Sequence, residues 1–333
     1  MPFRGSEDVG PGFIADPLSR FFALEQALEQ TRGLLGDRVP LRFVAVNLVL
    51  TPGDPAEITR DVVELRAGLD ARLPWYSGIA APMRLLLASA LLKLGDDADA
   101  FCDELERANA MMNELGFRRP HVYRALTVLA LRTRGALAPI DLLRLERVKA
   151  IYDAMKSHHW LLTGPEDIPA CAFLSFQDDP PEVLAARAAA IYKTLSDHRR
   201  MWQGDPLQTA SNVLALAGID PELIADRFEA LAKGLRKAGV RVGMAEYDEI
   251  ALLCFLSRPV AKVIEAAITY RDRLSQELSW MNTKLAFSLG TNLAYVRLVG
   301  GDPELGPLAD AKGLLDMQAI IDTRAAAAGA AVS

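Results

Sequence analysis

The sequence predicts an all-α fold of about seven two-helix, HEAT-like repeats. Three observations support this fold. Turns marked by Asp-Pro, or more loosely by Asp or Pro alone, recur about every 41 residues, an almost uniformly apolar segment precedes each turn, and an amphipathic segment follows it. A segment that is apolar on all sides is typical of a buried helix, and a charged face is typical of a helix at the surface. Because such pairs bury their apolar faces only by stacking, we expect an α-α superhelix.

The turns contain residues that start helices. Asp at the N-cap accepts a hydrogen bond from an unpaired backbone amide, and Pro at the first helical position needs no amide partner. The markers are Pro55, Asp97, Pro139, Pro180, Pro221, Pro259 and Pro303, which are separated by 42, 42, 41, 41, 38 and 44 residues. This regular spacing predicts that an outer helix begins at each marker.

The elements follow in order from a first helix that begins at Asp16-Pro17 and ends near Gly36. Buried helices are expected at 43–50, 85–94, 123–131, 168–176, 207–216, 249–256 and 285–296. Each precedes an amphipathic outer helix, and Gly116 and Gly239 are suited to end two of these outer helices.

No change in composition divides the chain into domains. We therefore expect one repeat domain over residues 13–327, with flexible tails at 1–12 and 328–333. Stacked pairs can form an open superhelix or a closed α/α toroid. We expect the open superhelix, because nothing in the sequence marks the two ends as complementary, and we keep the closed toroid as the alternative.

The composition argues against several classes of partner. Lys and Arg total 37 against 43 Asp and Glu, so the net charge of -6 disfavours nucleic acid. No apolar run approaches the roughly 18 residues of a membrane span, and the first residues lack the apolar core of a signal peptide. The three cysteines are far apart, which disfavours a disulfide framework. We expect a cytoplasmic protein without a nucleic-acid or membrane partner.

The segment from Met155 to Phe176 holds the densest set of chemically capable side chains. It precedes a buried helix, and in a stacked array the equivalent ends of the buried helices lie along one rim. The residues at or near these ends form a polar, net acidic set. They are Arg84, His121, Glu166, Asp167, Asp205, Gln208, Glu246, Asp248, Asn282 and Lys284.

Two interpretations of this rim remain open. His121, His159, Asp167 and Glu246 could bind a divalent metal ion, or His159 could act as a general base oriented by Asp167. Alternatively, acids and amides at helix N-termini are caps. No HxxxH, HExxH or CxxC spacing is present, so we favour caps and expect no metal or cofactor.

A resemblance supports the importance of this region. The order His159-Trp160-Leu-Leu-Thr163, Glu166-Asp167-Ile-Pro169, Gly204-Asp205-Pro-Leu207-Gln208 and Met244-Ala-Glu-Tyr247 resembles an uncharacterised bacterial family of similar length, known mainly from Bacillus relatives. The similarity extends from about residue 40 to 298, although Ile168 stands where Tyr is common. The family is a domain of unknown function, so the resemblance implies no activity, substrate or cofactor.

Three classes of function are compatible with the sequence. The favoured one is a binding scaffold for a peptide or protein, because helical arrays commonly present concave binding surfaces. Trp75, Trp160, Trp202 and Trp280 each precede a buried helix and could serve as anchors. The alternatives are an enzyme, possibly metal-dependent, with its site at the acidic rim, and a purely structural component. The candidate binding residues are His121, His159, Trp160, Thr163, Asp167, Asp205, Gln208 and Glu246.

Overall fold

The computed structural model describes residues 16–31, 38–117, 121–158, 162–199, 201–278 and 283–299, together with Met317. Within these residues the chain forms 14 α-helices and no β-strand. The all-α prediction is therefore confirmed. The expected tails at 1–12 and 328–333 lie outside the described residues.

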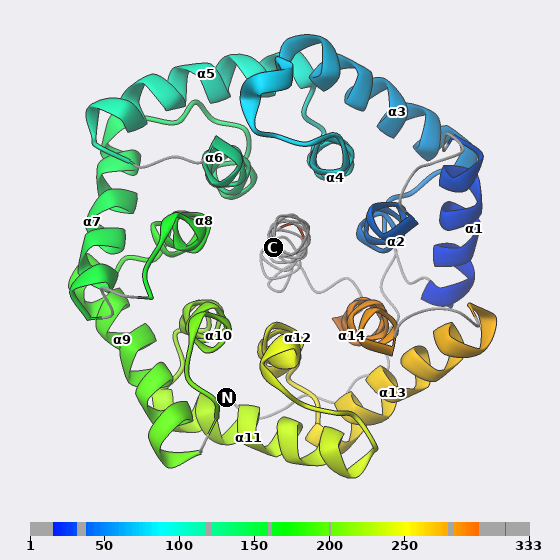
Figure 1. Cartoon of the computed structure of the whole chain (residues 1–333), viewed down its shortest axis with the longest axis vertical. Helices are drawn as coiled ribbons and strands as arrows, with labels where there is room; N and C mark the ends of the chain where they lie inside the picture. Colours follow the sequence, from blue (N-terminus) through cyan, green and yellow to red (C-terminus); the bar gives the residue numbers. More distant parts are fainter. Residues whose placement is uncertain are drawn as a thin grey trace, which may run out of the picture.

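The helices alternate between an outer and an inner position around a ring (Figure 1). The outer helices are α1 (Pro17–Gln30), α3 (Pro55–Arg72), α5 (Ala98–Glu114), α7 (Leu142–His158), α9 (Pro181–Lys193), α11 (Pro221–Lys237) and α13 (Val260–Glu277). The inner helices are α2 (Arg38–Asn47), α4 (Ala81–Leu94), α6 (His121–Arg134), α8 (Ile168–Leu174), α10 (Asp205–Ala215), α12 (Tyr247–Cys254) and α14 (Thr283–Val299).

Most of the outer helices begin where the turn markers predict. Asp54 caps α3 by accepting a hydrogen bond from the amide of Ala56 at 2.8 Å, and Asp97 and Asp220 cap α5 and α11 in the same way. Helix α7 begins later than Pro139, because the side chain of Asp141 accepts the amide of Arg144 at 2.6 Å. The marker Pro303 lies outside the described residues.

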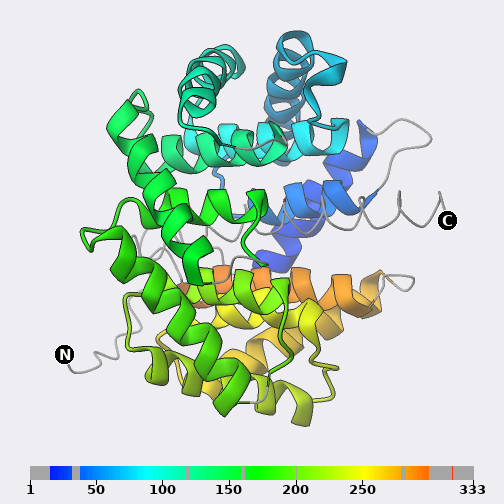
Figure 2. The ribbon, with the colours of Figure 1, turned by 60° about the vertical axis from the view of Figure 1, so that its left-hand side comes forward.

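The ring closes, because the last helix pair contacts the first. Helix α14 packs against both α1 and α2, and α1 and α14 lie close together in two views (Figures 1 and 2). Arg273 of α13 also donates hydrogen bonds to Asp16 at the start of α1, at 3.4 and 3.5 Å. The chain thus follows the closed alternative and not the expected open superhelix.

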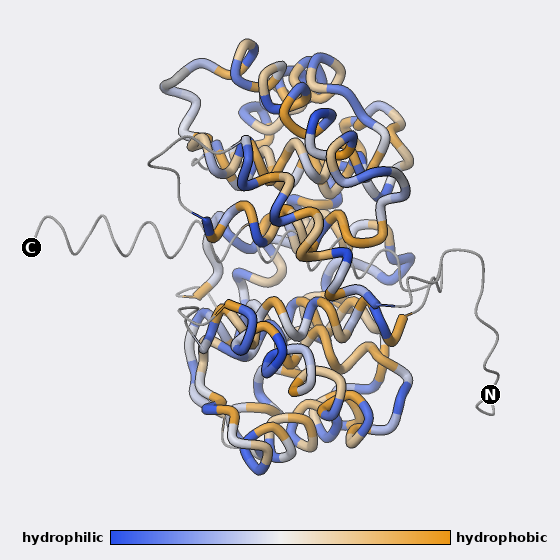
Figure 3. Tube along the Cα trace, turned by 90° about the vertical axis from the view of Figure 1, so that its right-hand side faces the viewer, coloured by the Kyte–Doolittle hydropathy of each residue, from blue (hydrophilic) through white to orange (hydrophobic). Residues whose placement is uncertain are grey.

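The physical reason for closure is the apolar character of the end helices. Leu18, Phe21 and Leu24 of α1 and Leu289 and Leu293 of α14 are almost completely buried. In an open array, the first and last inner helices would each leave one flank facing water, which is unfavourable for apolar surface. The outer helices keep an amphipathic alternation, visible as mixed hydropathy along the tube in Figure 3.

Arginines of outer helices bind the carbonyl groups at the ends of inner helices. Arg147 of α7 donates to the carbonyl oxygens of Ser175, Gln177 and Asp179, just beyond α8, at 3.0, 2.6 and 2.6 Å. Arg20 of α1 and Arg227 of α11 make the same contact at the ends of α2 and α12. Carbonyls at helix C-termini lack intrahelical partners, and the planar guanidinium donates to several of them at once.

Replacing Arg147 with Met should lower the free energy of unfolding by about 2–3 kcal/mol, because buried carbonyl groups lose charge-assisted hydrogen bonds. Urea unfolding followed by circular dichroism measures this change. Arg60→Met is the matched control, since the Arg60 side chain is 70% exposed, and it should change the free energy by less than about 0.5 kcal/mol. Equal effects of the two substitutions would contradict the structural role of Arg147.

Candidate functional site

The N-termini of the inner helices gather on one side of the ring, which we call the N-terminal rim. Each outer helix returns the chain between two consecutive inner helices, so the inner helices run in the same direction. The turns that enter α8 and α12 contain short 3-10 helices, η2 (Pro165–Asp167) and η4 (Met244–Glu246). Asp205 is the first residue of α10, and His121 is the first residue of α6. These predicted site residues therefore belong to one rim.

Asp167 is the centre of a buried polar cluster on this rim. Its carboxylate accepts hydrogen bonds from the amide of Gly164 at 3.0 Å, from Nδ2 of Asn212 at 2.9 Å and from Nε2 of Gln208 at 3.3 Å. Gln208 Nε2 also donates to Oγ1 of Thr163 at 3.0 Å. The structure thus brings together Thr163, Asp167 and Gln208, three of the residues expected from the sequence.

Asn212 is the member of this cluster that the sequence did not reveal. It lies four residues after Gln208 on α10, so both side chains project from one face of the helix. Its position in a segment that was expected to be a buried helix was the available signal, because a buried amide needs a polar partner.

Burial raises the pKa of Asp167 from its ordinary value of 3.8 to about 7. The negative charges of Glu166 and Asp205 act in the same direction, whereas the hydrogen bonds from Gly164 and Asn212 favour the ionised form and limit the rise. Asp167 therefore changes its charge near neutral pH, which is unusual for an aspartate.

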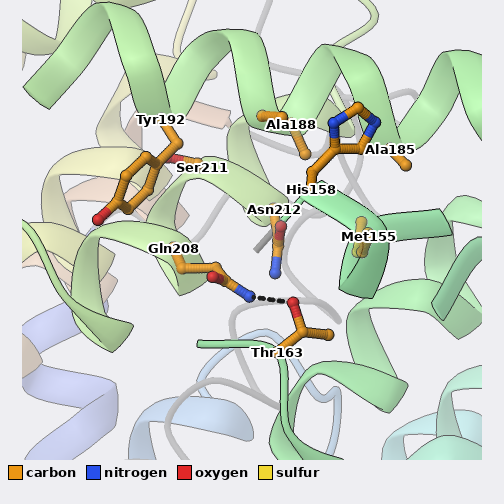
Figure 4. Close-up of a pocket in the computed structure, with 10 residues that line it drawn as sticks. Met155, His158, Thr163, Ala185, Ala188, Tyr192, Gln208, Ser211 and Asn212 are labelled. Carbon is orange, nitrogen blue, oxygen red and sulfur yellow. Dashed lines mark hydrogen bonds between the residues drawn. The ribbon is translucent and has the colours of Figure 1, made fainter. Parts of the chain in front are cut away.

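A small cavity adjoins the cluster between α7, α9 and α10 (Figure 4). Its lining consists of Met155, His158, Thr163, Ala185, Ala188, Ala189, Tyr192, Gln208, Ser211 and Asn212. Its volume of about 10 Å³ matches one water molecule. Oε1 of Gln208 is buried and accepts no hydrogen bond from the described part of the chain. The cavity can therefore hold a water molecule that donates a hydrogen bond to Oε1 of Gln208, but it is too small to admit a substrate.

Glu246 repeats the arrangement of Asp167 two helix pairs further along the chain. Its carboxylate is buried, and Oε2 accepts the amide of Gly243 at 2.7 Å, as Asp167 accepts that of Gly164. In both cases the acid satisfies a backbone amide three residues earlier, at the turn that enters an inner helix. This geometry agrees with the interpretation that these acids are caps.

The metal and general-base hypotheses depended on His159, which lies outside the described residues together with Trp160. Among the described residues, no group of three or more His, Cys, Asp or Glu side chains is arranged to hold a metal ion. His121 is partly buried at the first residue of α6. A role for His159 and Trp160 stays a prediction.

A much larger cleft opens elsewhere on the N-terminal rim, between the turn after α11 and the first turn of α14. Its volume is about 810 Å³, within the range of ligand pockets. Its lining consists of Pro206, Gly239, Val240, Arg241, Gly243, Met244, Ala245, Glu246, Arg271, Thr283, Lys284 and Phe287. We call it the rim cleft. Of its charged residues, Glu246 and Lys284 were expected at the rim, whereas Arg241 and Arg271 were not.

Trp202 lies on the rim close to this cleft. Its side chain is 73% exposed, and its backbone amide donates to the hydroxyl of Tyr247 at 2.9 Å. Tyr247 follows η4 directly and is completely buried, so its hydroxyl fixes the turn that carries Trp202. Pro206, a few residues after Trp202, lines the cleft itself. The turn that carries the exposed Trp202, four residues before the lining residue Pro206, is therefore anchored to Tyr247.

The comparisons with known proteins give a family without an activity. The chain matches the family described as "Protein of unknown function (DUF4003)" over residues 72–297. The chain belongs to this family. The match to DUF4003 confirms the resemblance to an uncharacterised bacterial family that the sequence motifs indicated.

One relative of this DUF4003 protein is "Uncharacterized protein YeaA" of Bacillus subtilis (strain 168), which is 26% identical over 184 residues. The match covers 54% of this chain and 54% of the relative, so the chain spans about half the length of the relative it matches. No solved structure matches the chain. None of the helices in the described residues is both long enough and apolar enough to cross a membrane.

The contribution of Asp167 to the stability of this DUF4003 protein should fall as the pH rises from about 4 to about 7, because folding favours the protonated form of this residue. Below this window both folded and unfolded forms are protonated, and the stabilisation is fully present. Above it the stabilisation is lost, with an upper bound of roughly 4 kcal/mol.

The Asp167→Asn variant should lack this contribution. Urea unfolding at several pH values measures the free energy of unfolding of wild type and variant. As the pH rises, the variant should become more stable relative to the wild type. Asp61→Asn, at a half-exposed aspartate of α3, controls for the loss of a negative charge. A difference that stays constant with pH would contradict the raised pKa of Asp167.

Proposed function

We propose that this DUF4003 protein binds a peptide or a segment of a protein partner at the N-terminal rim. The observation that carries the proposal is the rim cleft of about 810 Å³ with exposed apolar side chains beside it. Trp202 is 73% exposed and Met244 is 43% exposed. Tryptophan is enriched among residues that dominate binding energy, and methionine adapts to varied apolar partners.

The rim cleft supports binding better than the Asp167 cluster supports catalysis. The cavity beside Asp167 accommodates about one water molecule, and the carboxylate already accepts hydrogen bonds from amide groups of the protein. In the rim cleft, the lining carboxylate is that of Glu246, which is buried and bound to the amide of Gly243. Oε2 of this carboxylate is therefore already engaged by a backbone amide. We therefore propose a binding protein ahead of an enzyme.

A phage-displayed library of random peptides tests this function. Selection on the purified protein should enrich peptides, and synthetic copies of them should bind the wild type in a fluorescence anisotropy titration. The Trp202→Ala variant should bind them about tenfold more weakly or worse, because an exposed aromatic anchor is lost.

Leu143→Ala is the matched control. Leu143 is 75% exposed at the start of α7, on the rim opposite to Trp202. Its replacement should leave peptide affinity unchanged. The proposal fails when no peptide is enriched, or when the two variants weaken binding equally.

A further inference from the structure

We infer that the rim cleft recognises the carboxylate groups of an acidic peptide segment. This inference rests on the proposed function and deepens it by naming the chemistry of the ligand. Its basis is the charge of the lining, the direction of α14 and the apolar surface between the charged groups.

Cationic side chains outnumber acidic ones in the cleft. Arg241, Arg271 and Lys284 line it, against Glu246 as the carboxylate among the lining residues. The whole chain carries a net charge of -6, so the cleft is a local exception to an acidic protein. Cations that surround a concave surface of low polarity focus their field and attract anionic ligands.

Arg241 is the cation best placed to bind a ligand. It is exposed and lies in the turn between α11 and η4, and it makes no hydrogen bond or ion pair within the described part of the chain. Arg271 of α13 also lines the cleft, but its guanidinium is bound to Asp272, with Nε 2.7 Å from Oδ1. Arg241 therefore has unused donors, and guanidinium groups bind carboxylates with two parallel hydrogen bonds.

The first turn of α14 contributes a further positive field. Thr283 and Lys284 begin this 17-residue helix and both line the cleft. No acidic residue occupies its first turn. The amides at a helix N-terminus carry a partial positive charge that favours an anion, and here no acid of this turn offsets it.

Apolar side chains between these charges favour a peptide over a small free anion. Val240, Met244 and Phe287 line the same cleft, and its volume of about 810 Å³ is far larger than a phosphate ion requires. An acidic peptide with interspersed apolar residues matches both features. A long polyanion would extend beyond the cleft and meet the net negative charge of the rest of the chain.

Two labelled peptides test the inference by fluorescence anisotropy with the full chain. The first contains glutamates and leucines in a Gly-Ser background, and the second has glutamine in place of each glutamate. The glutamate peptide should bind about tenfold tighter or more, and its affinity should fall with added salt. Replacing both Arg241 and Lys284 with Glu should abolish this preference, and Arg241→Gln alone should reduce it.

The matched control reverses two charges on outer helices, Arg60→Glu and Lys262→Glu, whose side chains are 70% and 69% exposed. This variant should keep the preference, and thermal unfolding should show that all variants remain folded. Equal affinity for both peptides, or an unchanged preference without Arg241 and Lys284, would overturn the inference. Inorganic phosphate could also displace the glutamate peptide completely when its concentration equals that of the peptide's carboxylate groups. That result would overturn the inference as well, because the cleft would then bind anions in general.

The two proposals can fail separately. When the selected peptides bind in a manner that depends on Trp202 but show no preference for acidic residues, the peptide-binding function stands and the acidic ligand is wrong. When neither the selected peptides nor the glutamate peptide bind, both proposals are wrong.

Discussion

The inner helices of this protein are apolar on nearly every side, and the rest of the architecture follows from that constraint. Each inner helix needs an outer helix behind it and an inner neighbour on both flanks. A finite row of such helices leaves two flanks uncovered, and contact between α14 and the pair α1 and α2 removes both. The ring is therefore the arrangement in which no inner helix keeps an apolar flank in water.

Closing the ring places helix ends in confined surroundings, where backbone groups must still find partners. The two rims solve this problem differently. Where inner helices end, arginines such as Arg147 and Arg227 reach from outer helices to several carbonyl oxygens. Where inner helices begin, carboxylates such as Asp167 and Glu246 accept backbone amides. The acidic character of the N-terminal rim is thus first a consequence of folding.

The Asp167 cluster and the rim cleft differ in size and in what their polar groups bind. Asp167 is surrounded by amide donors from α10 and the preceding turn, and the adjoining space is about 10 Å³. The rim cleft is larger, and Arg241 projects donors that the described chain does not use. Polar groups that satisfy one another stabilise a fold, whereas donors directed into an accessible cleft remain available to a ligand.

The sequence by itself determined the helical pairs, their spacing and the turns that start most outer helices, because Asp and Pro act through local hydrogen bonds and backbone geometry. It also named Thr163, Asp167 and Gln208 among the candidate binding residues, without predicting that they contact one another. Only the tertiary structure decided that the array closes, that Asn212 joins Asp167, and that Arg241, Arg271 and Lys284 line one cleft. Those contacts join side chains from different helix pairs, and their distances depend on how all the pairs pack, which no local pattern encodes.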